Sequence, residues 1–166
     1  MKRAYTRRSK VKSKSYIKAI PLSKIAKFSM GDAAGAAKYP CVVDLVMLEP
    51  IQLRDNSVEA ARQQVHRHLD EKLKGNFYFI VSAYPHHILR ENKMLTGAGA
   101  DRMSTGMQRS FGKPVGIAAQ IHAGGKVFSI ACMKEAVPFV RSTLEKIRPK
   151  IPGVKAIKVS ERKQSS

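Results

Sequence analysis

The chain has 166 residues, of which 31 are Lys or Arg and 12 are Asp or Glu, so its formal net charge is +19. A surplus of this size attracts polyanions, and nucleic acid is the first partner to expect. No run of about 18 apolar residues marks a membrane span, and Cys41 and Cys132 lack the spacing of a zinc or disulfide framework. We therefore expect an intracellular protein without a metal or other cofactor, in which both cysteines pack as small apolar residues.

The positive charge is concentrated at the two ends of the chain. Residues 1–30 contain ten Lys or Arg and no acid, and residues 134–166 contain nine basic and three acidic residues. By contrast, residues 31–90 contain seven of each sign. The middle of the chain is thus neutral, and binding by charge is expected from the ends.

The first 18 residues mix Lys, Arg and Ser with Tyr5 and Tyr16, and show neither helical nor strand periodicity. Segments of this kind order against phosphates, where Arg makes bidentate contacts and Tyr can stack on a base. A merely solubilising tail is the alternative, but so many cations repel one another unless an outside anion compensates them. The arm residues expected to bind RNA are Lys2, Arg3, Tyr5, Arg7, Arg8, Lys10, Lys12 and Lys14.

The body begins with strand and helix signals. A Val-, Leu- and Met-rich run over residues 41–53, interrupted by Pro50, indicates one strand or two short ones. Asn56 and Glu59 form a capping-box pattern, after which apolar residues at helical spacing predict a helix over residues 57–74. The buried face of that helix would be formed by Val58, Ala61, Val65, Leu69 and Leu73.

Alternating patterns then predict three more strands. Residues 76–84 alternate and end at Pro85, which indicates a half-buried strand. Residues 115–121 alternate again, and a Gly-Gly turn leads into an apolar run over residues 127–133, which predicts a β-hairpin.

A last helix is predicted over residues 134–148, with Pro138 tolerated near its start. Strands that pair locally and two helices covering one sheet face indicate an α+β fold, a single domain with an antiparallel or mixed sheet. The domain would comprise an extended basic arm over residues 1–30, an α+β body over residues 31–148 and a basic tail over residues 149–166.

Residues 85–116 fit neither a strand nor one continuous helix, and the small, glycine-rich part over residues 96–108 predicts a long mobile loop. Such loops are usually functional or disordered, and we favour function. The loop has no Walker motif, and Arg102 stands where a dinucleotide fingerprint would need its third glycine. Its backbone, together with Arg102 and Arg109, could instead come close to RNA.

His86 and His87, with Glu91 four residues after His87, could suggest a metal or acid–base site, but no third ligand follows at a recognisable spacing. We favour hydrogen-bonding or RNA-facing histidines and predict that the protein is not an enzyme. An RNA-modifying or RNA-cleaving enzyme using these three residues is one alternative, and a DNA-compacting protein is another. The residues around the loop expected to bind RNA are His86, His87, Arg90, Lys93, Arg109 and Lys113.

The sequences HHILRENKMLTGAGADR and GMQRSFGKPVG, over residues 86–102 and 106–116, closely resemble the large-subunit ribosomal protein family numbered ten-e in archaea, ten in eukaryotes and sixteen in bacteria. The resemblance covers most of the chain. Residues 5–8 and 20–28 look like the basic arm of the family, and residues 56–62 look like its NxxEAAR helix start. The archaeal form fits best.

The resemblance implies a structural protein with an α/β-hammerhead fold, wedged into 23S-type rRNA beside the aminoacyl-tRNA site in the cytoplasmic ribosome. It also implies late joining to the large subunit. The implied partners are this rRNA, tRNA and neighbouring large-subunit proteins, with no membrane. The loop residues that it would place near the peptidyl-transferase region and tRNA are Thr96, Gly97, Gly99, Asp101, Arg102, Gly106 and Met107.

Overall fold

The computed structural model describes residues 20–92, residue 97 and residues 112–162. These residues form two antiparallel sheets, one with the strand order β1-β4-β7-β2-β8 and one with the order β3-β6-β5. The strands are β1 (Ser29–Gly31), β2 (Cys41–Met47), β3 (Ile51–Arg54), β4 (Tyr78–Val81), β5 (His87–Glu91), β6 (Lys113–Ile121), β7 (Lys126–Cys132) and β8 (Lys155–Glu161).

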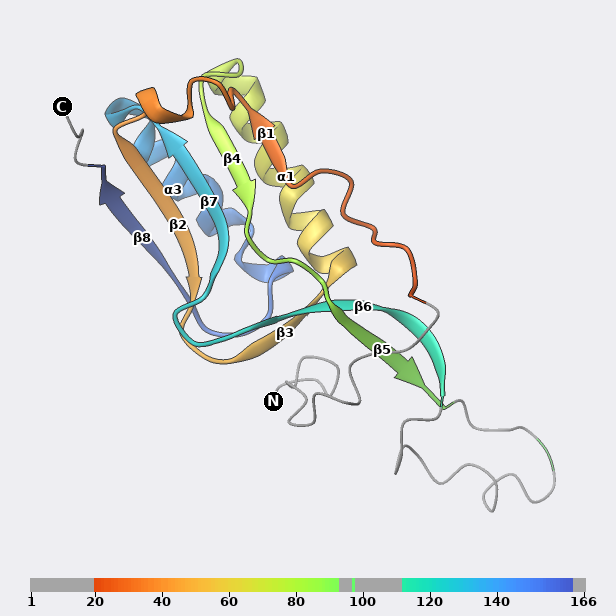
Figure 1. The fold of residues 1–166 in the computed structure, drawn as a ribbon. Helices are drawn as coiled ribbons and strands as arrows, with labels where there is room; N and C mark the ends of the chain where they lie inside the picture. The colour runs from red at the N-terminus through yellow and green to blue at the C-terminus, as the bar shows by residue number, and fades with distance from the viewer. Residues whose placement is uncertain (1–19, 93–96, 98–111, 163–166) are drawn as a thin grey trace.

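The two helices, α1 (Asp55–Leu73) and α3 (Val137–Lys146), lie on one face of the five-stranded sheet (Figure 1). Short 3₁₀ turns occur at Ala36–Lys38, Lys134–Ala136 and Arg148–Lys150. The predicted α+β fold with antiparallel pairing is confirmed, and so are both predicted helices.

The core fills the space between the helices and the five-stranded sheet. Four of the five predicted core residues of α1 are completely buried, and Leu73 packs against the core while partly exposed. On the sheet side, the rings of Phe79 and Phe128 meet edge to face with centroids 5.3 Å apart. Burying side chains of this size contributes roughly 1.5–3 kcal/mol each, so this layer is the main source of stability.

The start of α1 differs from the predicted capping box. The helix begins after Arg54, which makes no side-chain cap hydrogen bond. The carboxylate of Asp55 accepts hydrogen bonds from the backbone N–H groups of Asn56 and Lys24, at 2.8 and 3.1 Å. Glu59 accepts one from the N–H of Ala26 at 3.3 Å. The predicted capping box was therefore wrong, because these carboxylates bind the chain that precedes β1. We call this stretch, residues 20–28, the N-terminal segment.

The predicted hairpin over residues 115–133 is also wrong. β6 pairs with β3 and β5, whereas β7 pairs with β2 and β4, so the two strands belong to different sheets. The turn between them does form, but the Gly124 N–H donates to the carbonyl of Met47 and the Met47 N–H donates to the carbonyl of Gly125, at 2.7 and 2.9 Å. The turn therefore docks on the end of β2, and the chain passes from one sheet to the other.

Besides β1, which falls where the sequence predicted only the end of an extended arm, two further segments form strands where none was predicted. β5 and the start of β6 lie in the glycine-rich stretch of residues 85–116, which was expected to contain no strand. β8 lies in the expected basic tail and pairs with β2 along its whole length, from Cys41 opposite Glu161 to Met47 opposite Lys155. The pairing partners of both are distant in sequence or separated by a long loop, so local patterns do not reveal them.

Candidate nucleic-acid interface

The structure describes five of the residues predicted to contact RNA or tRNA: His86, His87, Arg90, Gly97 and Lys113. The remaining predicted contacts lie outside the described residues, namely Lys2, Arg3, Tyr5, Arg7, Arg8, Lys10, Lys12, Lys14, Lys93, Thr96, Gly99, Asp101, Arg102, Gly106, Met107 and Arg109.

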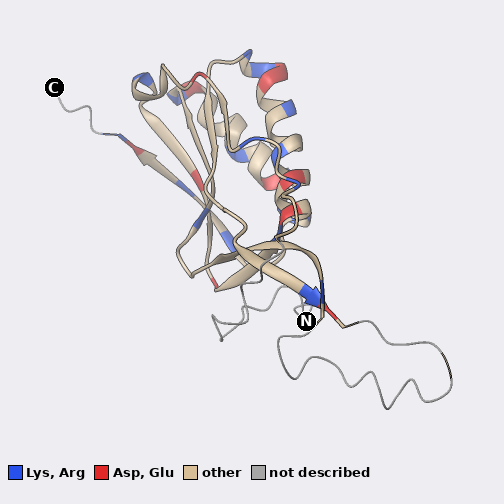
Figure 2. Cartoon of the chain, turned by 45° about the vertical axis from the view of Figure 1, so that its right-hand side comes forward, with Lys and Arg blue, Asp and Glu red and all other residues tan. Residues whose placement is uncertain are grey.

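The tip of the β5–β6 pair brings two of these cations together. Arg90 lies opposite Pro114 and Glu91 lies opposite Lys113, with a register shift after Leu89. Residues 112–115 are exposed, and Lys/Arg colouring marks this end of the molecule in Figure 2. β5 ends and β6 begins at this tip, so the described residues that precede and follow the glycine-rich segment lie there, away from the helices (Figure 1).

The two adjacent histidines have different surroundings. His86 is exposed, and its ring centroid lies 4.5 Å from that of Tyr84. His87 begins β5, is half-buried, and has a buried Nδ1 atom without a hydrogen-bond partner. Burial, with a smaller contribution from the charge of Arg90, lowers the pKa of His87 below its ordinary value of 6.5.

This geometry does not favour the predicted alternative of a catalytic group at His86, His87 and Glu91. His87 and Glu91 stand at opposite ends of β5, about 13 Å apart along an extended strand. Glu91 instead lies opposite Lys113. Within residues 20–92 and 112–162, no three His, Cys, Asp or Glu side chains come close enough together to hold a metal ion.

The lowered pKa of His87 gives a pH dependence of stability. The unfolded chain binds the proton more readily than the folded one, so this contribution is complete above about pH 6.5 and is lost as the pH falls below it. We expect the melting temperature of the wild-type protein to fall more between pH 7.5 and 5.5 than that of His87→Gln. His86→Gln, at the exposed neighbour, should behave as the wild type. An equal fall in His87→Gln would contradict this assignment.

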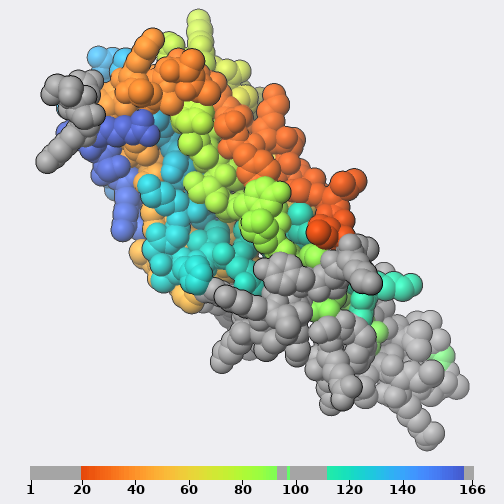
Figure 3. All heavy atoms as spheres, viewed as in Figure 1, coloured from red at the N-terminus to blue at the C-terminus, as the bar shows by residue number. Residues whose placement is uncertain are grey.

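At the start of β5, the end of this strand opposite the tip, the N-terminal segment and the chain that follows β4 form an aromatic cluster that the sequence did not predict. Phe28 and Tyr84 stack with centroids 5.1 Å apart and planes at 23°, and Tyr84 also contacts His86. The Val81 N–H donates to the carbonyl of Phe28 at 2.7 Å, which fixes the two segments together. Figure 3 shows the N-terminal segment lying against the chain that follows β4. We call Phe28, Tyr84 and His86 the aromatic column.

A shallow hollow of about 440 Å³ lies between the N-terminal segment and α1, and its lining includes Lys27, Arg62 and His66. Arg62 is already engaged, because Nε and Nη2 donate to the Glu59 carboxylate at 2.7 and 2.6 Å and Nη1 contacts the Met30 sulfur. The hollow therefore offers Lys27, which is exposed, as its accessible cation.

The sequence contained only part of the signal for this interface. A tyrosine before Pro85 and a histidine pair marks an unusual strand end, and a closer reading could have singled out Tyr84. Phe28, however, is 56 positions away from Tyr84, and its place follows from the register of β1 beside β4, where Ser29 lies opposite Ile80. No local pattern specifies that register.

Neither helix in the described part of the chain has the length and apolar content needed to cross a bilayer.

Comparison with known proteins gives a specific match. The model of the family described as ribosomal protein L16p/L10e matches residues 1–158.

Three archaeal relatives illustrate the similarity, each named large ribosomal subunit protein uL16. The relative from Hyperthermus butylicus is 41% identical over 172 residues, covering 99% of this chain and 94% of the relative. That from Halobacterium salinarum strain R1 is 45% identical, covering 90% and 83%. That from Haloarcula marismortui is 42% identical, covering 95% and 88%.

Proposed function

Because the chain belongs to the ribosomal protein L16p/L10e family and is a structural constituent of the large ribosomal subunit, we propose that it binds 23S-type rRNA through its basic ends and the tip of β5 and β6. The family is structural and not enzymatic, so the predicted absence of catalysis is confirmed and the RNA-modifying alternative is rejected. As a ribosomal component, the protein works in the cytoplasm beside rRNA and other ribosomal proteins.

The observation that carries the proposal is the arrangement of the β5–β6 tip. Arg90 and Lys113 come from strands on either side of the glycine-rich segment, and antiparallel pairing places them at one end of the molecule. Cations grouped in this way can neutralise adjacent phosphates, and the strands behind them fix their position. The exposed residues of the tip leave room for an RNA backbone to approach.

We further propose that the glycine-rich segment over residues 96–108 lies near the peptidyl-transferase region and contacts tRNA. The described residues Glu91 and Lys113, which precede and follow it in the chain, lie opposite each other at the exposed tip, and its sequence resembles that of the family loop with this role. Small residues allow close backbone approach to RNA. Late joining to the large subunit is the corresponding proposal for assembly, since a loop that reaches the tRNA path needs that path to be formed.

Sedimentation tests whether the protein binds the rRNA of the large subunit. The native protein should travel with large subunits at moderate salt and leave them at high salt, because phosphate contacts weaken as counterions compete. A protein that stays at the top of the gradient at moderate salt would contradict rRNA binding. Titration against duplex DNA and structured rRNA side by side separates this function from DNA compaction, which predicts equal affinity and salt slope for the two.

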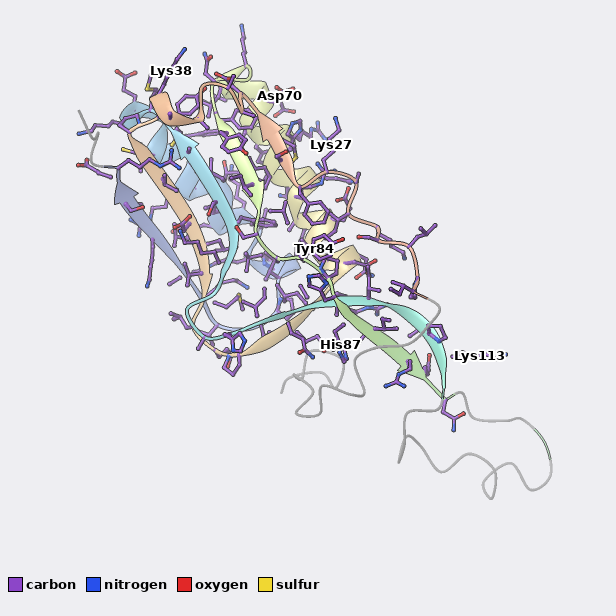
Figure 4. The ribbon with its side chains drawn as sticks, viewed as in Figure 1. Lys27, Lys38, Asp70, Tyr84, His87 and Lys113 are labelled. Atoms are coloured by element: carbon purple, nitrogen blue, oxygen red, sulfur yellow. The ribbon has the colours of Figure 1, made fainter. Side chains whose placement is uncertain are left out.

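A tethered cleavage probe tests the orientation. The native Cys41 and Cys132 are buried, and burial raises the pKa of Cys132 to about 11, so an introduced surface cysteine should react selectively. We expect an iron chelate on Lys113→Cys to cleave rRNA of the peptidyl-transferase region. The same chelate on Asp70→Cys, far from Lys113 in Figure 4, should cleave elsewhere. Identical cleavage patterns from the two positions would contradict the proposed orientation.

A further inference from the structure

The aromatic column is exposed although its rings are already packed together. Tyr84 is 55% exposed and His86 is exposed, whereas Phe28 is half-buried. Aromatic rings are mostly buried in folded proteins, and those left at the surface are enriched at binding sites. The ring centroid of Tyr84 lies 5.1 Å from that of Phe28 and 4.5 Å from that of His86. Because these contacts already hold the rings in place, the side chains would lose little conformational entropy on binding a further ring.

We propose that the aromatic column is a stacking site for an unpaired nucleobase of the large-subunit rRNA. Tyr84 contacts both other rings, and none of the ring contacts found among the described residues joins Phe28 to His86. Tyr84 therefore lies between the two rings, and the exposed imidazole of His86 ends the column. The His86 ring is tilted by 42° to the Tyr84 ring, and a base placed on its exposed face extends the row of rings. This inference rests on the proposed rRNA binding and adds a site and a ligand to it.

The charge next to the column favours a nucleotide as its occupant. Lys27 directly precedes Phe28 of the column and is exposed. A nucleotide has a flat aromatic face joined to a phosphate, so exposed rings with a cation next to them in the chain complement both of its parts. An apolar segment of a neighbouring protein would match the rings but not the cation.

The base must be unpaired, because a paired base already stacks within its helix and does not expose its face. Stacking on an aromatic side chain depends little on base identity, since every base has a π-face. The column therefore selects a single-stranded or bulged nucleotide and not a particular sequence. The column stands at the start of β5, at the opposite end of that strand from the tip, so this nucleotide is distinct from the phosphates that we assign to Arg90 and Lys113.

Variants of Tyr84 test the site in the full-length protein with deproteinised 23S-type rRNA as the probe. Tyr84→Ala should lower the affinity about tenfold, whereas Tyr84→Phe, which keeps the ring, should stay within about threefold of the wild type. Leu48→Ala is the control, because Leu48 is 52% exposed and lies between β2 and β3, outside the column. Melting curves check that each variant folds.

Ultraviolet crosslinking of the wild-type protein to the same rRNA provides a readout that depends on no variant. We expect a crosslink from Tyr84 or His86 to a nucleotide that is unpaired, and its loss when a complementary oligonucleotide pairs that nucleotide. Equal rRNA affinity of Tyr84→Ala and Tyr84→Phe would overturn the stacking site. So would a crosslink from the column to a neighbouring protein in intact subunits. If the wild-type protein itself does not bind the rRNA, the proposed function fails first and this inference fails with it.

Discussion

Replacing Arg7, Arg8, Lys10 and Lys12 with Gln is expected to lower the affinity for 23S-type rRNA by about 10³-fold at about 0.1 M salt. Each phosphate contact contributes about 0.7–0.9 to the slope of log affinity against log salt, so four contacts contribute about three. The slope of log affinity against log salt should therefore become shallower by about three. Filter binding between about 0.05 and 0.3 M salt measures both quantities.

The matched control neutralises four exposed cations in or directly after the helices: Arg67 and Lys72 in α1, Lys74 directly after α1, and Arg141 in α3. Each variant has four fewer positive charges than the wild-type +19, so the overall charge is the same in both. The helix variant should keep most of the wild-type affinity and slope, because we assign its cations no phosphate contacts. Equal losses in the two variants would mean that the chain binds RNA through net charge alone and that the arm has no special role.

Local patterns in the sequence were sufficient to predict the elements that bury one face against the core. The helix face containing Val58, Val65 and Leu69 is completely buried, and the alternation over residues 76–84 places Phe79 and Val81 inside. A periodic apolar pattern specifies which face of an element is buried, because that face must leave water. The same pattern contains no information on the neighbouring element.

Pairing between strands was therefore the part that the sequence could not specify. Gly124 and Gly125 indicated a turn, and a turn is present, but its hydrogen bonds to Met47 separate the flanking strands into two sheets. β8 pairs with β2 across more than a hundred residues. These pairings follow from which strands together enclose the core, and that is a property of the whole fold.

Part of the candidate site could likewise be predicted from the sequence, whereas another part could not. His86, His87, Arg90 and Lys113 were selected from composition and from the family resemblance, and the structure brings Arg90 and Lys113 to one tip. The aromatic column was missed because Phe28 reaches Tyr84 through a register between distant segments. Clusters of charged residues can be recognised in the sequence, whereas a contact between rings that are distant in sequence is determined by the tertiary structure.

Arg62→Met is expected to destabilise the protein by about 2–4 kcal/mol, because it leaves the carboxylate of Glu59 without its main partner. The two side chains are only 10% and 11% exposed, and their ion pair is 2.6 Å long. Glu59 also accepts hydrogen bonds from Gln63 and from the backbone of Ala26, so the pair fastens the N-terminal segment to α1. Urea unfolding at pH 7 measures the loss.

The control is Arg67→Met on the same helix, where Arg67 and Glu71 form an exposed pair with side chains 78% and 58% accessible. Exposed pairs contribute about 0–1 kcal/mol, so this variant should remain close to the wild type. A loss in Arg62→Met no larger than that in Arg67→Met would show that the buried pair does not anchor the segment.

The pH dependence of the Arg62→Met loss separates a lost ion pair from lost packing. Hydrogen bonding to Arg62 lowers the pKa of Glu59 below its ordinary value of 4.5, so this stabilisation is complete above that value and is lost as the pH falls through the lowered pKa. In Arg62→Met, the pKa of Glu59 loses its largest lowering cause and is therefore higher than in the wild type, so Glu59 should be protonated at a higher pH in the variant, which relieves the unpaired charge. The stability gap between the two proteins should therefore narrow from pH 7 toward pH 4, whereas a pure packing defect would leave the gap constant.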